Sequence, residues 1–232
     1  MMRFIKFSLI AAVAVMFFSA LAVTETKAQA SVKNEILKRM EDNRNSLDTL
    51  KTSVEMVKLN AQLGEREIYQ GSAVYVPAKG RDVLVRIDWA KPVQETLTVA
   101  NKKYTIYQPR LKQAMEGSAS DAKGGSGKAS SLFAFIDMSK AELKANYEIE
   151  YLGPENVKGG TPTWHLEMTP KGQASFKVAE MWVDANGMPL QIKITEKNKD
   201  TTEIFLSGIR KNESVKASIF QQKLPPGTKI IK

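Results

Sequence analysis

A period-two alternation of apolar and polar residues recurs along most of this chain, and it constrains the fold more than any other feature. In "VLVRIDW" (residues 83–89) the odd-numbered residues are all large and apolar, while two of the three even-numbered ones are charged. Such a segment forms a strand with one apolar face. Similar runs rich in valine, isoleucine and tyrosine recur from residue 50 to 168 and from 176 to 211. About ten strands with few helices predict a mainly β (α+β) fold, a curved antiparallel sheet forming a half-open barrel.

Turn residues separate these runs. Asn101-Lys102, Asn186-Gly187 and Lys199-Asp200 each stand between two alternating segments. Asparagine and glycine tolerate the positive φ that tight hairpins require. The stretch "DANG" at 184–187 is therefore interpreted as a hairpin turn and not as a calcium loop, which would need more clustered carboxylates.

One helix is expected before the strands. In residues 31–46 Ser31 is suited to the N-cap, and Ile36, Leu37 and Met40 recur at helical spacing with charged residues between them. This pattern predicts an amphipathic helix lying on an apolar surface. A free membrane-surface helix is the alternative, but acidic side chains dilute its basic face.

The alternation breaks at "EGSASDAKGGSGKASS" (residues 116–131), which has no hydrophobic periodicity and predicts a long flexible loop. A short apolar segment follows, and then a helix is expected over 139–145, with Ser139 and Glu142 at capping-box spacing. Two short helices on a tether suggest a lid. Its predicted apolar residues are Leu132, Phe133, Phe135, Ile136 and Met138.

The first thirty residues have the layout of a secretory signal peptide. Basic Arg3 and Lys6 precede an apolar run over 7–23, and Ala28-Gln29-Ala30 forms a small-x-small cleavage site. Cleavage would leave a single domain over 31–232. The alternative is an N-terminal anchor, because the run approaches the ~18–20 residues of a spanning helix. The chain has no cysteine, which excludes a lipid anchor of its own and disulfides. We expect a periplasmic protein and a monomer.

The net charge of the chain indicates which kind of surface it favours but does not identify a specific partner. Residues 1–30 contain three basic residues and one acidic residue, so their removal lowers the net charge from +9 to +7. A moderate positive charge favours anionic surfaces such as lipid headgroups. The lysines and arginines are scattered along the chain and not gathered in a stripe, so no nucleic-acid partner is predicted.

A search for chemistry yields little. The single histidine, His165, lies on the polar face of its strand beside Glu167. One histidine and no cysteine argue against a zinc site, and no nucleophile elbow accompanies the histidine. "KGGSGK" (123–128) lacks the spacing of a phosphate loop. No catalytic residue, metal site or cofactor is predicted.

What remains is an excess of large apolar residues on a curved sheet. They either fill a core or line a cavity for an apolar ligand, and the pattern alone leaves both interpretations open. An acyl chain gains about 0.8 kcal/mol for each CH₂ that it buries, so such a cavity can hold lipid without specific polar contacts. The residues predicted to line it are Val85, Ile87, Trp89, Leu97, Val99, Tyr104, Ile106, Trp164, Leu166 and Met168.

An ordered set of segments resembles the LolA-like outer-membrane lipoprotein carriers. "YQGSAVYVP", "VRIDWAKP" and "TLTVANKKYTIYQPRLKQ" resemble successive strands of that family. "WHLEMTPK", "MWVDANGMPLQIKI" and "FQQKLPPGTKII" resemble its closing strands and final phrase. The resemblance spans nearly all of residues 31–232 in the same order.

The resemblance implies a half-barrel covered by lid helices, with an apolar cavity for the acyl chains of lipoproteins. It implies a carrier without catalysis, which receives cargo from an inner-membrane transporter and passes it to an outer-membrane acceptor. Val85 and Ile87 match positions of large cavity-facing residues. One departure concerns the family's arginine, which stands before a proline after the second strand and latches the lid. This chain has "YVPAKGRD" there, with Pro77 or a neighbour at the matching place and Lys79 and Arg81 close by.

Two functions are therefore compared. The first is a periplasmic carrier of acylated lipoproteins or related lipids. The second is an envelope sensor or binding module of the same fold whose partner is a protein, as in relatives that sense envelope stress.

Overall fold

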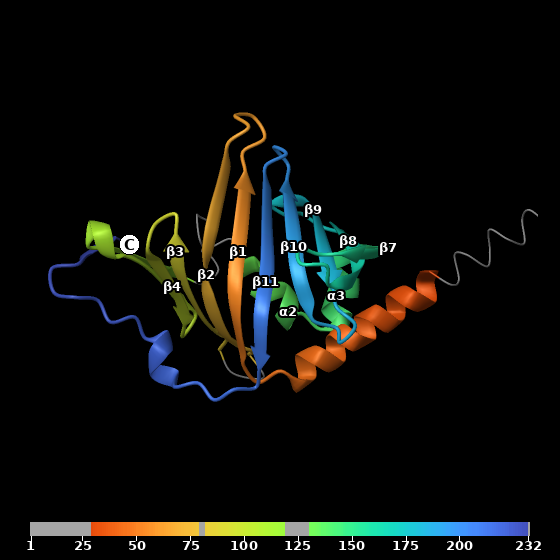
Figure 1. Cartoon of the computed structure of the whole chain (residues 1–232), viewed down its shortest axis with the longest axis horizontal. Helices are drawn as coiled ribbons and strands as arrows, with labels where there is room; N and C mark the ends of the chain where they lie inside the picture. The colour runs from red at the N-terminus through yellow and green to blue at the C-terminus, as the bar shows by residue number, and fades with distance from the viewer. Residues whose placement is uncertain (1–28, 79–81, 119–129, 232) are drawn as a thin grey trace, which may run out of the picture.

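The computed structural model describes residues 29–78, 82–118 and 130–231, and these form one open twelve-stranded sheet (Figure 1). The strand order is β12-β6-β5-β4-β3-β2-β1-β11-β10-β9-β8-β7. Neighbouring strands are antiparallel except β12 and β6, which are parallel. The strands are β1 (Leu50–Leu59), β2 (Arg66–Val76), β3 (Leu84–Lys91), β4 (Glu95–Ala100), β5 (Lys103–Gln108), β6 (Gln113–Ser118), β7 (Tyr147–Asn156), β8 (Pro162–Pro170), β9 (Phe176–Val183), β10 (Pro189–Glu196), β11 (Thr201–Lys211) and β12 (Lys229–Ile231).

Helices cover one face of this sheet, which we call the inner face. They are the N-terminal helix (residues 29–46), α2 (Ser130–Asp137) and α3 (Lys140–Asn146). Two 3₁₀ turns, η1 (Pro109–Leu111) and η4 (Ala217–Phe220), lie in the connections. The predicted fold class is confirmed: a curved, mainly antiparallel sheet that remains open, with few short helices.

The period-two alternation sets the inner face as predicted. Val85 pairs with Val99, which pairs with Tyr104 on the next strand, and Ile87 and Leu97 form the adjacent row. Because paired residues share a face, these rows stack into one apolar wall.

The N-terminal helix packs into the core beside β7 and β8, as its amphipathic pattern predicts. Ile36, Leu37 and Met40 are buried in the core, and Leu47 follows them. Arg39 lies over the ring of Trp164, with its guanidinium carbon 5.2 Å from the ring centroid. The N-terminal helix is thus a fixed part of the core and not a free membrane-surface helix.

The predicted turns are confirmed. Asn101 and Lys102 both have positive φ, and so does Gly187. The Asp184 carboxylate accepts hydrogen bonds from the backbone N–H groups of Asn186 and Met188, which closes the "DANG" turn.

Three details differ from the sequence prediction. The composition of residues 116–118 predicts loop, but they end strand β6, because they pair with residues 103–105 of β5. The stretch "PENVKGG" (154–160) is rich in turn residues, which predicts a turn, but its first three residues belong to β7. The tail ends in β12, which docks on β6 from more than a hundred residues away, a pairing that local pattern cannot reveal. Residues 119–129 of the predicted loop lie outside the described residues, and its last two residues, 130 and 131, begin helix α2.

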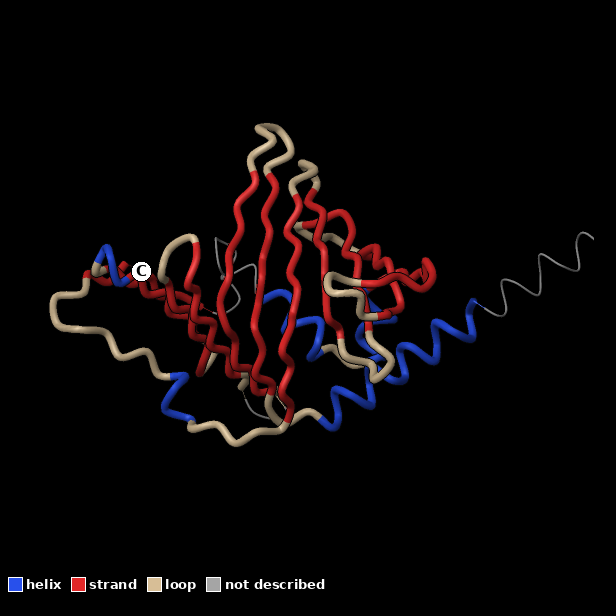
Figure 2. The backbone as a smooth tube through the Cα atoms, in the orientation of Figure 1, coloured by secondary structure: helices blue, strands red, loops and turns tan. Residues whose placement is uncertain are grey.

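The outer face is less polar than the alternation suggests. Trp182 is buried there beneath the tip of the β7–β8 hairpin, whose Lys158 ammonium group reaches Glu55 of β1 at 2.8 Å. Figure 2 shows this tip turned in front of the long central strands. At the other end of the sheet the turn η4 buries Phe220, and its Ile219 carbonyl accepts a hydrogen bond from Arg86.

Candidate functional site

The predicted cavity residues come together on the inner face. All are buried except Tyr104 and Trp164, which are half-buried. They do not border one large open cavity, because helix α2 and the N-terminal helix fill the concave side of the sheet. The structure therefore shows a closed arrangement in which the protein's own side chains occupy the concave space.

Helix α2 supplies the apolar cover that the lid prediction described. Phe133, Phe135 and Ile136 are 2–4% exposed and belong to the core. The Phe133 ring stacks on Tyr75 of β2, with centroids 5.0 Å apart. Phe135 contacts Tyr147 with centroids 5.6 Å apart. Met138 follows the helix and is half-buried; Leu132 lies in α2, and its side chain is outside the described part of the chain.

A cavity of about 320 Å³ remains between the lid and the wall. Val83, Val85 and Val99 form its floor, and Phe133, Ala134 and Met138 its roof. The carboxylates of Asp137 and Glu142 border it. The lid is thus incompletely packed against β3 and β4.

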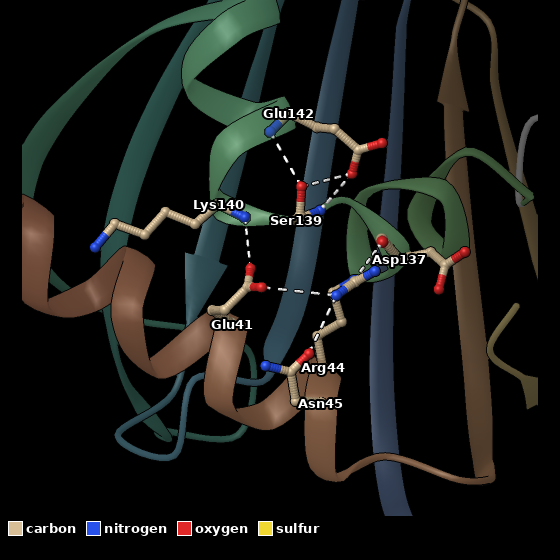
Figure 3. Close-up of polar contacts among 7 residues, drawn as sticks. All are labelled: Glu41, Arg44, Asn45, Asp137, Ser139, Lys140 and Glu142. Atoms are coloured by element: carbon tan, nitrogen blue, oxygen red, sulfur yellow. Dashed lines mark hydrogen bonds and ion pairs between the residues drawn. The ribbon is translucent and has the colours of Figure 1, made fainter. Parts of the chain in front are cut away.

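Two residues of the N-terminal helix hold the lid, as Figure 3 shows. Arg44 Nε donates to the backbone carbonyl of Asp137 at 2.6 Å, at the C-terminal end of α2. The Glu41 carboxylate accepts from the backbone N–H of Lys140 at 2.6 Å, at the N-terminal end of α3. Helix ends have unpaired carbonyl and N–H groups and opposite partial charges, so each side chain has the favourable sign for its helix end. We call Glu41 and Arg44 the latch pair.

The junction between the lid helices is also capped from within. The Ser139 hydroxyl accepts from the Glu142 backbone N–H at 3.1 Å, and the Glu142 carboxylate accepts from the Ser139 N–H at 2.7 Å. The bond from the Ser139 N–H, and then one from the Ser139 hydroxyl to the same carboxylate at 2.7 Å, lower the pKa of Glu142. The capping box predicted from the sequence is confirmed.

Two polar atoms in the inner core have no hydrogen-bond partner among the described residues. They are the hydroxyl of Tyr75 and the indole nitrogen of Trp89. Burial, followed by the nearby Asp137 carboxylate, raises the pKa of Tyr75, so the hydroxyl keeps its proton. That carboxylate nevertheless makes no hydrogen bond of good geometry to it.

A larger depression lies elsewhere. It measures about 860 Å³ and is bordered by Glu55, Lys158 and Phe205, beneath the β7–β8 hairpin tip on the outer face. It is wide and open, and an ion pair crosses it, so it offers less shelter to an acyl chain than the inner face.

His165 lies on the outer face, among residues that take no part in the lid. Its ring stacks on Trp182 at 4.2 Å between centroids. Nδ1 is 2.8 Å from a Glu155 carboxylate oxygen, and Nε2 is 3.2 Å from Glu180. The sequence places His165 beside Glu167, but the fold brings these two other carboxylates to its ring. Two carboxylates on opposite sides of one imidazole tie strands together and do not form a Ser–His–Asp arrangement.

Other chemistry is equally sparse. Across the described residues, no group of three or more His, Cys, Asp or Glu side chains could hold a metal ion. In the same ranges, no helix is both long and apolar enough to cross a bilayer.

Sequence reasoning missed the latch pair. The resemblance places a latching arginine after β2, where this chain has Pro77 or a neighbour, and it leaves open whether another residue latches the lid; the nearby Lys79 and Arg81 lie outside the described residues. The signal in the sequence was the pair of Glu41 and Arg44 on the polar side of the amphipathic helix. The pattern alone cannot distinguish this pair from a solvent-exposed salt bridge.

Comparisons with known proteins agree with this architecture. Residues 80–223 match the family model described as outer membrane lipoprotein carrier protein LolA. This match covers more than half of the chain. No curated protein matches the sequence.

Among solved structures, an uncharacterized conserved protein from Thermus thermophilus is similar at 13% identity, covering 86% of this chain and 98% of that one, with a TM-score of 0.54. The Pseudomonas aeruginosa MucA/MucB complex is similar at 12% identity and a TM-score of 0.50, covering 82% of this chain and 60% of that one. A putative outer membrane lipoprotein-sorting protein domain from Vibrio parahaemolyticus has 15% identity and a TM-score of 0.46, covering 81% and 95%. The first two likenesses show the same fold.

Proposed function

The chain belongs to the LolA family of outer membrane lipoprotein carriers, and on that basis we propose that it binds the acyl chains of lipoproteins or related lipids between the sheet and the lid. In this proposal the acyl chains take the place of α2, and the cargo is shuttled toward the outer membrane. The predicted wall residues, from Val85 to Met168, contact the chains.

The lid is the observation that carries this proposal. Helix α2 buries three large apolar side chains against the sheet, whereas the strongest polar bonds to it are made at its C-terminal end. Replacing those side chains by acyl CH₂ groups exchanges one apolar contact for another. Each CH₂ brought out of water adds about 0.8 kcal/mol, so the exchange favours cargo with long chains.

The latch pair takes the role that the resemblance assigns to an arginine after the second strand. Arg44 reaches the lid from the N-terminal helix and not from the sheet, but it satisfies a lid carbonyl in the closed state. Opening the lid breaks this bond, so the latch pair sets the free-energy difference between the open and closed states.

The location of the carrier and its partners in this proposal follow from the predicted signal peptide and from the family. Cleavage after residue 30 releases a monomeric carrier into the periplasm. An inner-membrane transporter supplies the cargo, and an outer-membrane acceptor removes it. No catalytic step is required, because cargo moves by differences in affinity.

The test is binding of a synthetic triacylated lipopeptide to the mature protein, followed by native mass spectrometry. Val99→Phe fills the cavity under the lid and is expected to weaken binding by at least about tenfold, which is about 1.4 kcal/mol. Val57→Phe makes the same change on the opposite face of the sheet and serves as the matched control. Circular dichroism shows whether both variants fold. A wild-type protein that binds no lipopeptide contradicts the carrier function.

A protein-binding module is the second candidate. The observation that favours it is that side chains of α2 and the N-terminal helix fill much of the inner face in the described part of the chain, beside a cavity of about 320 Å³. The MucA/MucB structure gives an example of this fold in a complex with a protein. A stable protein partner recovered together with a bare, lipid-free chain would favour this candidate.

A further inference from the structure

The inner face has a chemical feature that a purely apolar site does not need. The Trp89 indole nitrogen and the Tyr75 hydroxyl are buried, the two side chains being 3% and 0% exposed, and neither atom has a hydrogen-bond partner among the described residues. An unsatisfied buried donor costs about 1–3 kcal/mol. Phenylalanine at either position would avoid this cost, so the two donors are a specific and destabilising feature of the wall.

Both donors stand on the wall that the cargo would contact. Tyr75 on β2 pairs with Val85 of β3, and Trp89 lies four residues further along β3. At about 3.4 Å per residue the two positions are roughly 13 Å apart along the strands. Ala73 and Ile87, paired between them, are apolar and buried. The wall is therefore an apolar strip with a hydrogen-bond donor near each end.

The neighbouring aromatic rings bring no acceptor to either donor. Phe133 of α2 stacks on the Tyr75 ring in the closed state and brings no acceptor to its hydroxyl. Trp89 contacts the ring of Tyr69 edge-on, with centroids 5.7 Å apart, and this contact also brings no acceptor to the indole nitrogen. Asp137, the last residue of α2, brings a carboxylate near the Tyr75 hydroxyl but makes no hydrogen bond of good geometry to it, so a ligand that replaces the lid can bring a better-placed acceptor.

The surroundings limit the kind of acceptor. Asp137 lies close enough to Tyr75 to influence its pKa. Glu95 is the cross-strand partner of Trp89, and its carboxylate accepts a hydrogen bond from Gln108 at 2.7 Å. A free carboxylate on the ligand would be repelled by these groups, whereas a neutral carbonyl oxygen would not.

We propose that Trp89 and Tyr75 bind the carbonyl oxygens of ester- or amide-linked acyl chains, so that the site selects acyl esters and amides over free fatty acids and alkyl ethers. This inference rests on the proposed carrier function and specifies its ligand. The apolar strip holds the hydrocarbon, and the two donors recognise the linkage that joins it to the headgroup.

The experiment compares a synthetic lipopeptide whose glycerol chains are ester-linked with an analogue in which the same chains are ether-linked. The wild-type protein is expected to bind the ester form about tenfold more tightly. Tyr75→Phe removes only the hydroxyl, so it should abolish much of this preference while binding of the ether form stays unchanged. The same variant should unfold at an equal or higher urea concentration, because a buried unsatisfied group has been removed.

A variant of the second donor and a second pair of ligands test whether the ester preference depends on more than Tyr75. Trp89→Phe removes the indole donor and should likewise narrow the ester–ether difference. Methyl palmitate should bind more tightly than palmitate. If the wild-type protein binds ester and ether forms equally, the inference is overturned and the carrier function stands. If it binds neither form, the carrier function itself fails.

Discussion

Two helical elements cover the same inner face and are attached to it in different ways. The N-terminal helix buries residues along three turns and is tied to distant strands, with Lys33 donating to the Ile149 carbonyl at 2.8 Å and Arg39 to the Ala185 carbonyl at 2.8 Å. Helix α2 is one eight-residue segment held mainly by three apolar side chains and by Arg44 of the latch pair. The N-terminal helix is therefore a permanent part of the core, whereas α2 is a cover that can be removed. The following predictions test this difference between the two helices.

The largest effect is expected at Gly187, in the turn that supports the N-terminal helix. Its φ is +80°, and a Cβ there would lie 2.1 Å from the Arg39 carbonyl oxygen. Gly187→Ala should therefore lower the free energy of unfolding by about 3 kcal/mol, measured by urea denaturation.

Gly160→Ala is the matched control for that variant. Gly160 has a similar φ of +79°, but no heavy atom lies within 4 Å of its added Cβ. It should cost only about 1 kcal/mol, the cost of backbone strain alone. Equal losses in the two variants would show that the N-terminal helix is not locked against the turn.

The second prediction compares the two covers directly. Leu37→Ala in the N-terminal helix should lower the free energy of unfolding by about 3 kcal/mol, as expected for a fixed core position. Phe133→Ala in α2 deletes a larger side chain but should cost only about 1 kcal/mol in global unfolding, because α2 can undock before the sheet unfolds. It should also raise lipopeptide affinity, since the lid competes less well. If Phe133→Ala costs more than Leu37→Ala, the lid is ordinary core.

These two covers also show what the sequence could predict. Ile36, Leu37 and Met40 at helical spacing and Ser139 with Glu142 at capping distance are local signals, and both were confirmed. The alternating residues around Val85 and Ile87 set the inner face correctly for the same reason. Local patterns determine which side of an element is apolar.

The closed state could not be predicted, because it depends on contacts between distant parts of the chain. Arg44 meets the carbonyl of Asp137 across 93 residues, and Lys140 meets Glu41 across 99. The alternation of apolar residues predicts an apolar inner face, but it cannot predict whether a ligand or a helix covers that face, because both are apolar. The partners of His165 were likewise hidden, since they come from neighbouring strands and not from its own.

The third prediction concerns the latch pair. Arg44→Leu removes a charge-assisted hydrogen bond to the end of α2 and should speed amide hydrogen exchange in α2 about tenfold, which is about 1.4 kcal/mol of local stability. Exchange in β1 and β11 should not change. Lys38→Leu removes an exposed ion pair with Asp42 on the same helix and is the control. Unchanged exchange in the Arg44 variant would mean that packing alone holds the lid.

The smallest effect is expected from pH. Hydrogen bonds from Ser139 lower the pKa of Glu142, so its ionised form stabilises the start of α3. This contribution is present above the ordinary glutamate range, near pH 4.3, and is lost as pH falls through the lower folded pKa. Amide exchange of α3 should therefore accelerate in acid. Glu142→Gln should reduce that pH dependence; an equal acid response in both proteins would rule out the capping carboxylate as its source.

The central seam of the sheet has a consequence for how the chain reaches this structure. Strands β1 to β6 follow one another as neighbours and can pair soon after they emerge, but the second edge of β1 must wait for β11, whose partner residues lie about 150 positions later in the sequence. Long-range pairing of this kind slows folding. Until β11 arrives, both halves expose their inner apolar rows to solvent. In this topology the interior closes late, because the two halves of the sheet are joined only through β11.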